Sequence, residues 1–255
     1  MPQLRTPAQG VRNIVRFNWP FFAMALGVVV ALGGGAWLSS GLLRGLLAAA
    51  AFATLLPVAV SLGVSWWVYD RSELYRLDWL GRVPNLKLGR ALNIHSGFDE
   101  TSELLRERVQ NLVVFDFYDP AAHTEASIAR ARRAYDVFEG TQVVKTTALP
   151  LPDDSVDTAF VIFAAHEIRD DAERAAFFCE LGRVLKADGH MVVTEHLRDA
   201  PNALAYTAGV FHFLSKRTWQ KTFERAGLRV STSFRITPFV TTFVLKKIAT
   251  GEATR

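Results

Sequence analysis

The sequence predicts a protein of two parts, a pair of membrane-spanning helices followed by an α/β domain with a mostly parallel sheet. Two apolar runs without any charge, 19–40 and 46–69, stand near the start of the chain. Beyond residue 89, short apolar runs alternate with amphipathic stretches, which is typical of parallel strands joined by crossover helices. The 255 residues are 50% hydrophobic and 21% charged, a balance that excludes a disordered chain.

Composition also excludes several functional classes. The single cysteine, Cys179, cannot form an internal disulfide or a cysteine-rich metal site, so we expect a reducing compartment and a structural role for Cys179 in the core. The formal net charge is +4, but many basic residues flank the apolar runs, where they are typical of membrane topology signals. We therefore expect neither a nucleic-acid partner nor a bound metal.

Residues 1–69 are predicted to form a membrane anchor of two helices. Each apolar run is long enough to cross about 30 Å of hydrocarbon. Arg44 is the only charge in the turn between the runs, whereas arginines precede the first run and follow the second, which places both termini on the cytoplasmic side. Neither run contains an acidic residue or histidine, which favours an anchor over a transport path. A cleaved signal peptide is the alternative for the first run.

Residues 70–88 are predicted to lie on the membrane surface. Leu74, Tyr75 and Trp79 alternate there with Arg76 and other charged residues, and a proline follows. This mixture is typical of a short interfacial amphipathic helix. We assign the remaining residues, 89–255, to the α/β domain.

The α/β domain is predicted to contain five strands of a parallel sheet and a closing hairpin. The expected strands cover 91–94, 112–117, 141–145, 158–163 and 191–195. The expected helices cover 101–109, 124–138, 172–186 and 203–214. Ser215 is predicted to cap a further helix that ends at Gly227, and strands 229–236 and 239–246 then form an antiparallel pair.

Two stretches of the chain resemble a known family. They are ALPLPDDSVDTAFVIFAAHEI, which begins at Ala148, and ELGRVLKADGHMVVTEH, which begins at Glu180. Their order and spacing are similar to those of class I S-adenosylmethionine-dependent methyltransferases with a type 11-like domain. The resemblance covers about 88–246. It implies a Rossmann-like fold, in which a seven-stranded, mostly parallel sheet ends in an antiparallel hairpin, and S-adenosylmethionine as the cofactor.

The resemblance also implies where the cofactor binds. The family's acidic-x-Gly-x-Gly-x-Gly loop falls on Asn93, His95, Gly97 and Asp99, so only the middle glycine is kept. Gly97 still allows a close approach of the backbone to a ligand, and Asn93 and His95 are expected to contact the cofactor. The alternative for His95 is a turn residue without ligand contact.

Asp116 is the strongest candidate for cofactor binding. It closes an apolar strand about 20 residues beyond the first loop, where an acid can accept hydrogen bonds from both ribose hydroxyls. The alternative is a loop-capping aspartate. The remaining expected cofactor contacts are Phe117, Thr147, Leu149 and Ala164.

Polar residues after the fourth and fifth strands are the candidates for catalysis. His166 and His196 are the expected bases, and Glu167 is expected to assist them. Glu195, Arg198 and His212 are expected to contact the substrate. A hydrogen-bonded structural role is the alternative for each histidine.

Together these features predict a multi-pass protein of the inner (cytoplasmic) membrane with its methyltransferase domain in the cytoplasm. The expected substrate is a lipophilic small molecule such as a quinone, isoprenoid or lipid, because the anchor holds the domain where such molecules dissolve. Two alternatives stay open. One is a non-catalytic anchored protein that binds the cofactor or a partner through an altered loop, and the other is an enzyme that transfers a different group from the same cofactor. The oligomeric state also stays open.

Overall fold

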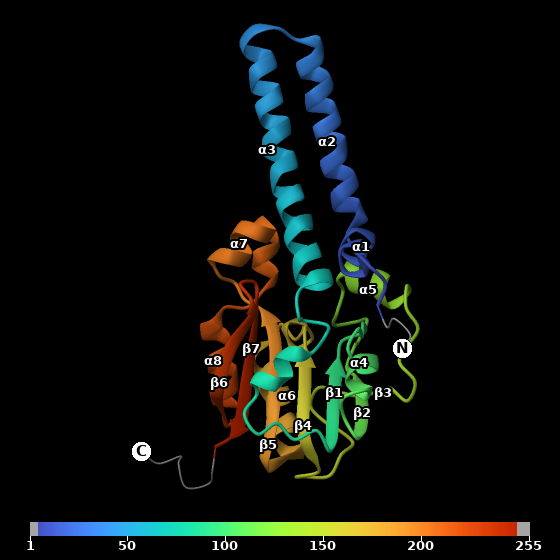
Figure 1. Ribbon diagram of the computed structural model, residues 1–255, viewed down its shortest axis with the longest axis vertical. Coiled ribbons are helices and arrows are strands. Elements are labelled where there is room, and N and C mark those ends of the chain that lie inside the picture. Colours follow the sequence, from blue (N-terminus) through green and yellow to red (C-terminus); the bar gives the residue numbers. More distant parts are fainter. Residues whose placement is uncertain (1–4, 249–255) are drawn as a thin grey trace.

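A computed structural model describes residues 5–248 as a long helical pair standing on an α/β unit (Figure 1). The helices before the sheet are α1 (Gln9–Phe17), α2 (Trp19–Leu38) and α3 (Gly41–Trp66), followed by the helical turns η1 (Trp67–Arg71) and η2 (Asp78–Arg82). The helices of the α/β unit are α4 (Ser102–Arg106), α5 (Ala126–Arg132), η3 (Ala165–Glu167), α6 (Asp171–Val184), α7 (Ala200–Tyr206), η4 (Thr207–His212) and α8 (Lys216–Arg225).

A seven-stranded sheet in the order β3-β2-β1-β4-β5-β7-β6 forms the centre of the α/β unit. Its strands are β1 (Arg90–His95), β2 (Asn111–Asp116), β3 (Gln142–Val143), β4 (Val156–Ile162), β5 (Leu185–His196), β6 (Leu228–Thr237) and β7 (Val240–Lys247). The first five strands pair in parallel, and β7 pairs antiparallel with both β5 and β6. The predicted fold, a mostly parallel sheet closed by an antiparallel hairpin, is confirmed.

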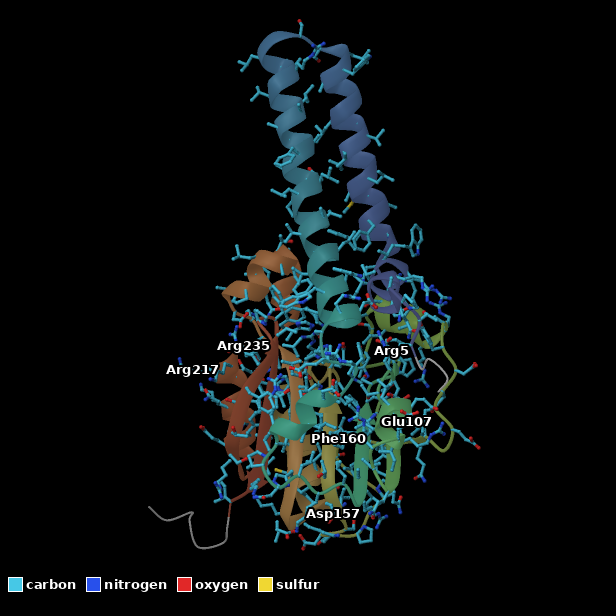
Figure 2. All side chains as sticks on the ribbon, viewed as in Figure 1. Arg5, Glu107, Asp157, Phe160, Arg217 and Arg235 are labelled. Carbon is cyan, nitrogen blue, oxygen red and sulfur yellow. The ribbon has the colours of Figure 1, made fainter. Side chains whose placement is uncertain are left out.

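Apolar side chains cover both faces of this sheet. On one face, Phe178 of α6 and Phe223 of α8 pack against the strands in one buried cluster. On the other face, Leu105 of α4 and the segment before β1 bury a second cluster that contains Phe160. Figure 2 shows Phe160 in the middle of the sheet and Asp157 at the edge farthest from the helical pair. The core thus fixes the positions of the strands. The loops at the edge nearest the helical pair are then available to form a binding site.

The segment between η1 and β1 is not the interfacial helix that the sequence predicts. Leu74, Leu77 and Trp79 of this segment are at most 1% exposed and pack against the sheet. Trp79 donates its indole N–H to the carbonyl of Leu74 over 2.9 Å. An amphipathic pattern fits a sheet face as well as a bilayer, and here the sheet buries it. This part of the predicted domain boundary is therefore corrected: the segment is a layer of the α/β unit.

Smaller differences concern helix ends and one side chain. The predicted helix 203–214 is two elements, α7 and η4, because Thr207 has a positive φ of 49° that ends the α-helix. Cys179 is exposed, so its predicted place in the core is wrong. Ser215 caps α8 as expected, since its hydroxyl accepts from the Thr218 N–H. Helix α1 was not predicted at all.

Helices α2 and α3 are long and apolar enough to cross a membrane. Few of their side chains are buried, so their apolar surfaces lack a covering in the described part of the chain. Figure 1 shows that the pair extends beyond the carboxyl ends of the parallel strands, the edge at which such folds bind ligands.

Two partly buried carboxylates join α1 to the rest of the molecule. Asp70 accepts from the free N–H groups of Gly10 (2.7 Å) and Val11 (2.9 Å) in the first turn of α1. Gly10 is required there, because a Cβ would lie 2.3 Å from the Cβ of Tyr69. Glu100, after β1, accepts from four side chains, those of Arg5, Gln9, Asn13 and Tyr75.

Replacement of Glu100 by alanine is expected to loosen α1. The change leaves the partly buried Arg5 guanidinium without its carboxylate, and a charge-assisted hydrogen bond of this kind contributes about 1.5–3 kcal/mol. Trypsin should therefore cut after Arg12 or Arg16 roughly tenfold faster or more in Glu100→Ala, as measured by mass spectrometry. Glu103→Ala, which removes an exposed glutamate of α4, is the control. Equal cleavage rates in the two variants would contradict the role of Glu100.

Candidate active site

A cavity of about 230 Å³ lies at the carboxyl edge of the sheet. Two groups of residues form its walls. One group comes from α1, η1 and the segment after η1 and includes Asn13, Ile14, Phe17, Tyr69 and Tyr75. The other group comes from the loops after the strands and includes His95, Ser96, Phe98, Phe163, His166, Glu167 and His196. The cavity therefore lies where α1 and η1 meet the carboxyl edge of the sheet.

His166 is held by a carboxylate from the neighbouring strand. It lies in η3, directly after β4, and its Nδ1 is 2.7 Å from Oε2 of Glu195 in β5. Its Nε2 is 3.1 Å from Oε1 of Glu167. Burial lowers the pKa of His166, but Glu195 and Glu167 outweigh burial and raise that pKa to about 10. His166 is thus a cation at neutral pH in this arrangement, and a hydrogen-bond donor rather than the base that we expected.

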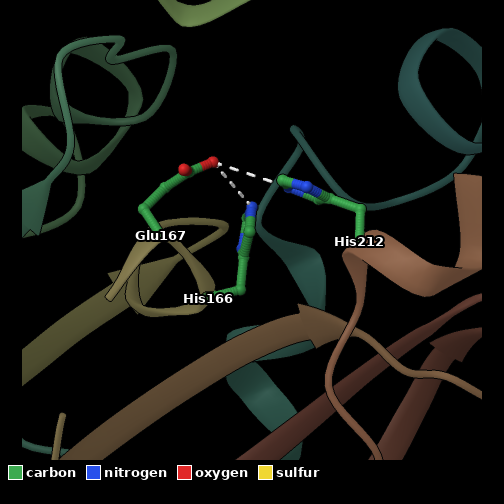
Figure 3. Close-up of side chains that lie close together, drawn as sticks. All are labelled: His166, Glu167 and His212. Carbon is green, nitrogen blue, oxygen red and sulfur yellow. Dashed lines mark ion pairs between the residues drawn. The ribbon is translucent and has the colours of Figure 1, made fainter. Parts of the chain in front are cut away.

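Glu167 and His212 complete a cluster with His166 (Figure 3). His212 comes from η4, and its Nε2 is 3.6 Å from Oε1 of Glu167. Burial raises the pKa of Glu167, but the two histidines hold it well below its usual range. The structure therefore brings His166, Glu167, Glu195 and His212 together.

His196 occupies a different position. Its Nδ1 donates to the carbonyl of Phe239 (2.9 Å), and its Nε2 accepts from the Tyr69 hydroxyl (2.7 Å). Its ring is stacked between those of Phe163 and Phe213, with centroids 5.0 and 4.9 Å away. Burial lowers the pKa of His196 to about 4. Both nitrogens are in use, so the expected catalytic role of His196 is replaced by a structural one: it ties η1 to the sheet.

The loop after β1 presents unpartnered polar atoms. Both ring nitrogens of His95 and the hydroxyl of Ser96 are buried and lack a hydrogen-bond partner among the described residues. Gly97 has a φ of 73°, the left-handed conformation that explains why this glycine is kept. Buried polar atoms are normally satisfied, so orphaned atoms at a cavity wall indicate a site for a polar ligand.

Asp116 is buried and fully engaged by its own chain. Its Oδ1 accepts from the backbone N–H groups of Gly97 (2.8 Å) and Tyr118 (2.9 Å). Its Oδ2 pairs with the guanidinium of Arg132 in α5. A Cβ on Gly97 would lie 2.9 Å from the Tyr118 ring, and the pocket beside Asp116 measures only about 10 Å³. Arg132 and Tyr118 therefore occupy the space next to the expected ribose-binding carboxylate.

The other expected site residues do not line the large cavity in the described part of the chain. Asn93 donates to the hydroxyls of Thr101 and Ser102. Arg198 donates to the carbonyls of Phe211 and Phe213, and so braces η4 instead of facing a substrate. Phe117, Leu149 and Ala164 are buried in the core, and Thr147 is exposed.

Sequence reasoning missed the part of the site that comes from α1, η1 and α5. Asn13 accepts from the Tyr135 hydroxyl (2.7 Å), and Phe17 contacts Phe98 edge to face with centroids 5.3 Å apart. These contacts join residues that are far apart in the chain. Only the small residue Gly10, placed before an apolar span, signals that α1 packs closely.

Comparison with known proteins gives a family match. Residues 92–193 match the family model described as a methyltransferase domain. No curated protein matches the chain. Similar solved structures include a SAM-dependent methyltransferase from Leishmania major, with 15% identity, coverage of 76% of this chain and 77% of that chain, and a TM-score of 0.51.

Two archaeal structures are similar to the same degree. The PH0226 protein from Pyrococcus horikoshii has 17% identity, covers 70% of this chain and 93% of its own, and has a TM-score of 0.51. A chain from the complex of the Haloferax volcanii methyltransferase activator Trm112 with a methyltransferase has 17% identity, coverages of 74% and 96%, and a TM-score of 0.50. These likenesses confirm the fold.

Residues 92–193 belong to the methyltransferase domain family. The class of protein is thus a methyltransferase domain preceded by two apolar helices, and S-adenosylmethionine is the cofactor that the family indicates. The residues present fit this cofactor in chemistry, since Asp116 offers a carboxylate and His95 and Ser96 offer unpartnered polar atoms. The ribose end fits only if Arg132 leaves Asp116.

The lowered pKa of His196 makes the stability of the fold depend on pH. The ordinary histidine pKa is 6.5, and the pKa of His196 in the folded protein is about 4. Between these two pH values His196 is therefore protonated in the unfolded chain and neutral in the folded chain. Stability is therefore lost as pH falls from about 6.5 towards 4, by roughly 3 kcal/mol at pH 4 from this residue. The free energy of unfolding, measured with a denaturant in detergent, should fall less between pH 8 and pH 4 in His196→Gln than in the wild type. Equal losses in the variant and the wild type would refute this account.

Proposed function

We propose that this chain is a membrane-anchored S-adenosylmethionine-dependent methyltransferase that acts on a lipophilic small molecule. One observation carries the proposal: a single cavity is bounded by the cofactor loop on one side and by α1 and η1, the segments that flank the two apolar helices, on the other. A substrate dissolved in a bilayer reaches such a cavity without crossing bulk water. Quinones, isoprenoids and lipids are the substrate classes that fit this route.

The chain's own residues divide the cofactor site into two ends. Gly97, His95 and Ser96 would hold the polar end of the cofactor, and Asp116 would accept from the ribose hydroxyls after Arg132 withdraws. When bound, S-adenosylmethionine supplies an electrophilic methyl group. Asp116 can exchange Arg132 for a ribose, because ribose hydroxyls donate hydrogen bonds to its carboxylate as the Arg132 guanidinium does.

The acceptor half of the cavity combines an apolar wall with one polar group. Ile14, Phe17, Phe98 and Phe163 supply apolar surface, which suits a hydrocarbon tail or ring. His166, oriented by Glu195, is placed to donate from Nε2 to an acceptor oxygen. Glu167, which the two histidines keep ionised, is placed to orient an acceptor hydroxyl by accepting its hydrogen bond.

The membrane placement belongs to this proposal. Helices α2 and α3 are both taken to span the inner (cytoplasmic) membrane, with both termini and the methyltransferase domain on the cytoplasmic side. The positions of Arg12 and Arg16 before α2 and Arg71 after α3 support this orientation.

A second function is favoured by the contact between Arg132 and Asp116. A chain whose ribose site is permanently closed by its own arginine would be a non-catalytic anchored protein that binds a partner. Cofactor affinity separates the two functions, because only the enzyme has to open this contact.

Arg132 and Asp116 should therefore have opposite effects on cofactor binding. Arg132→Met removes the competitor for the carboxylate and keeps a long side chain, so S-adenosylmethionine should bind about five- to tenfold more tightly, as expected when a closed state is removed. Asp116→Asn should weaken binding at least tenfold. Isothermal titration calorimetry on the full chain in detergent measures both constants.

Arg133→Met serves as the matched control, because Arg133 is the next residue and its guanidinium donates to the carbonyl of Ala129 instead of to Asp116. The control should bind like the wild type. No binding by the wild type or by Arg132→Met would favour the non-catalytic function.

The acceptor class is tested with labelled cofactor. Protein in native membranes, given S-adenosylmethionine with a tritiated methyl group, should transfer label into the fraction that organic solvent extracts. Asp116→Asn should lower this incorporation at least tenfold. Label found only in the aqueous fraction would refute a lipophilic acceptor.

A further inference from the structure

We propose that His166, Glu167 and His212 bind one divalent metal ion of the zinc type at the wall of the cavity. Three side chains from two distant segments, η3 and η4, converge there and offer two imidazoles and a carboxylate. This ligand set is one that zinc takes in catalytic sites, where three protein ligands leave a position open. The inference goes beyond the proposed function, and metal binding itself does not depend on methyl transfer.

The separations of the ligand atoms suit a single ion. Oε1 of Glu167 is 3.1 Å from Nε2 of His166 and 3.6 Å from Nε2 of His212. One ligand atom from each residue lies within 4.8 Å of the others. Metal–ligand bonds of about 2.0–2.2 Å in a tetrahedron place ligand atoms about 3.3–3.6 Å apart. Figure 3 shows one carboxylate oxygen of Glu167 paired with both rings.

A second observation, independent of these distances, comes from the groups behind the histidines. Glu195, which is 1% exposed, holds Nδ1 of His166 at 2.7 Å and so directs Nε2 towards the cluster. Glu125 lies 3.0 Å from Nδ1 of His212, and Arg169 contacts both ring nitrogens, so His212 binds an ion through Nε2 once Arg169 pairs with Glu125 alone. Carboxylates that bind the second nitrogen of a histidine are characteristic of metal sites, because they fix the ring and strengthen the ligand.

Charge also favours a dication at the cluster. Glu167, Glu195 and Glu125 bring three negative charges to the cluster, and Arg169, which contacts both Glu125 and His212, brings one positive charge. With neutral histidines the cluster has an excess of two negative charges, and a bound dication neutralises this excess.

At this position the ion would contact the acceptor in its half of the cavity. His166 and Glu167 line the cavity, so the open coordination position faces it. An ion there would bind an acceptor oxygen and lower the pKa of a hydroxyl, without any change of redox state. This role alone rests on the proposed function.

Metal binding is tested on the full chain in detergent, without cofactor. Protein treated with a chelator and then titrated with Zn²⁺ in competition with a chromophoric chelator should bind one equivalent per chain. Co²⁺ should give the intense visible bands of a tetrahedral site. His212→Ala and Glu167→Gln should each weaken Zn²⁺ binding at least a hundredfold, and Glu195→Gln should weaken it about ten- to hundredfold.

His123→Gln provides the matched control, because His123 stacks on Tyr118 away from the cluster. It should bind Zn²⁺ like the wild type, and circular dichroism checks that every variant is folded. Less than one tenth of an equivalent bound, or equal affinities in His212→Ala and His123→Gln, would overturn the metal site. Either result leaves the cofactor titrations unaffected, so failure of the metal site and failure of the methyltransferase assignment are distinguishable.

Discussion

The contact between Glu100 and the first helix is the interaction on which the site depends. A carboxylate buried beside a sheet edge is costly unless charges and hydrogen bonds compensate it. Arg5, Gln9, Asn13 and Tyr75 supply that compensation, and they bring α1 over the carboxyl ends of the strands. Asp70 adds a cap at the start of the same helix. Helix α1 and the α/β unit are therefore joined around one cavity.

As a result, one wall of the cavity is polar and the other is apolar. The strand ends contribute groups that carry charge or lack partners, such as His166, Glu167 and His95. Helix α1, which precedes the helical pair, contributes apolar surface through Phe17. A site with these two walls can hold a polar cofactor and an apolar acceptor at once. The stacked and hydrogen-bonded His196 keeps the two walls together, which explains why a residue suited to catalysis is used for structure.

Much of the fold was predictable from local patterns. Charge-free runs of sufficient length identify α2 and α3, and short apolar runs identify the strands, because both signals depend only on neighbouring residues. The convergence of His166, Glu167 and Glu195 follows from the rule that parallel strands end at one edge. The position of His212 beside them does not follow from this rule, since η4 is a separate element.

The errors came from contacts between distant residues. Leu74 and Trp79 fit a bilayer or a sheet equally well, and only the tertiary structure decides between them. Helix α1 is amphipathic but only nine residues long, and its position depends on contacts with Asp70 and Glu100 that the local pattern does not reveal. The pairing of Arg132 with Asp116 joins a helix to a strand end and leaves no trace in the spacing of residues. Likewise, nothing in the sequence tells which of two histidines has both nitrogens occupied.

The central claim is that cofactor and acceptor meet in one cavity under the membrane helices. A cryo-electron microscopy structure of the full chain in lipid nanodiscs with S-adenosylhomocysteine tests it most directly. The account predicts ribose density on the carboxylate of Asp116, Arg132 turned away, and lipid around α2 and α3. Arg132 still on Asp116 with the nucleoside absent or bound elsewhere would contradict it.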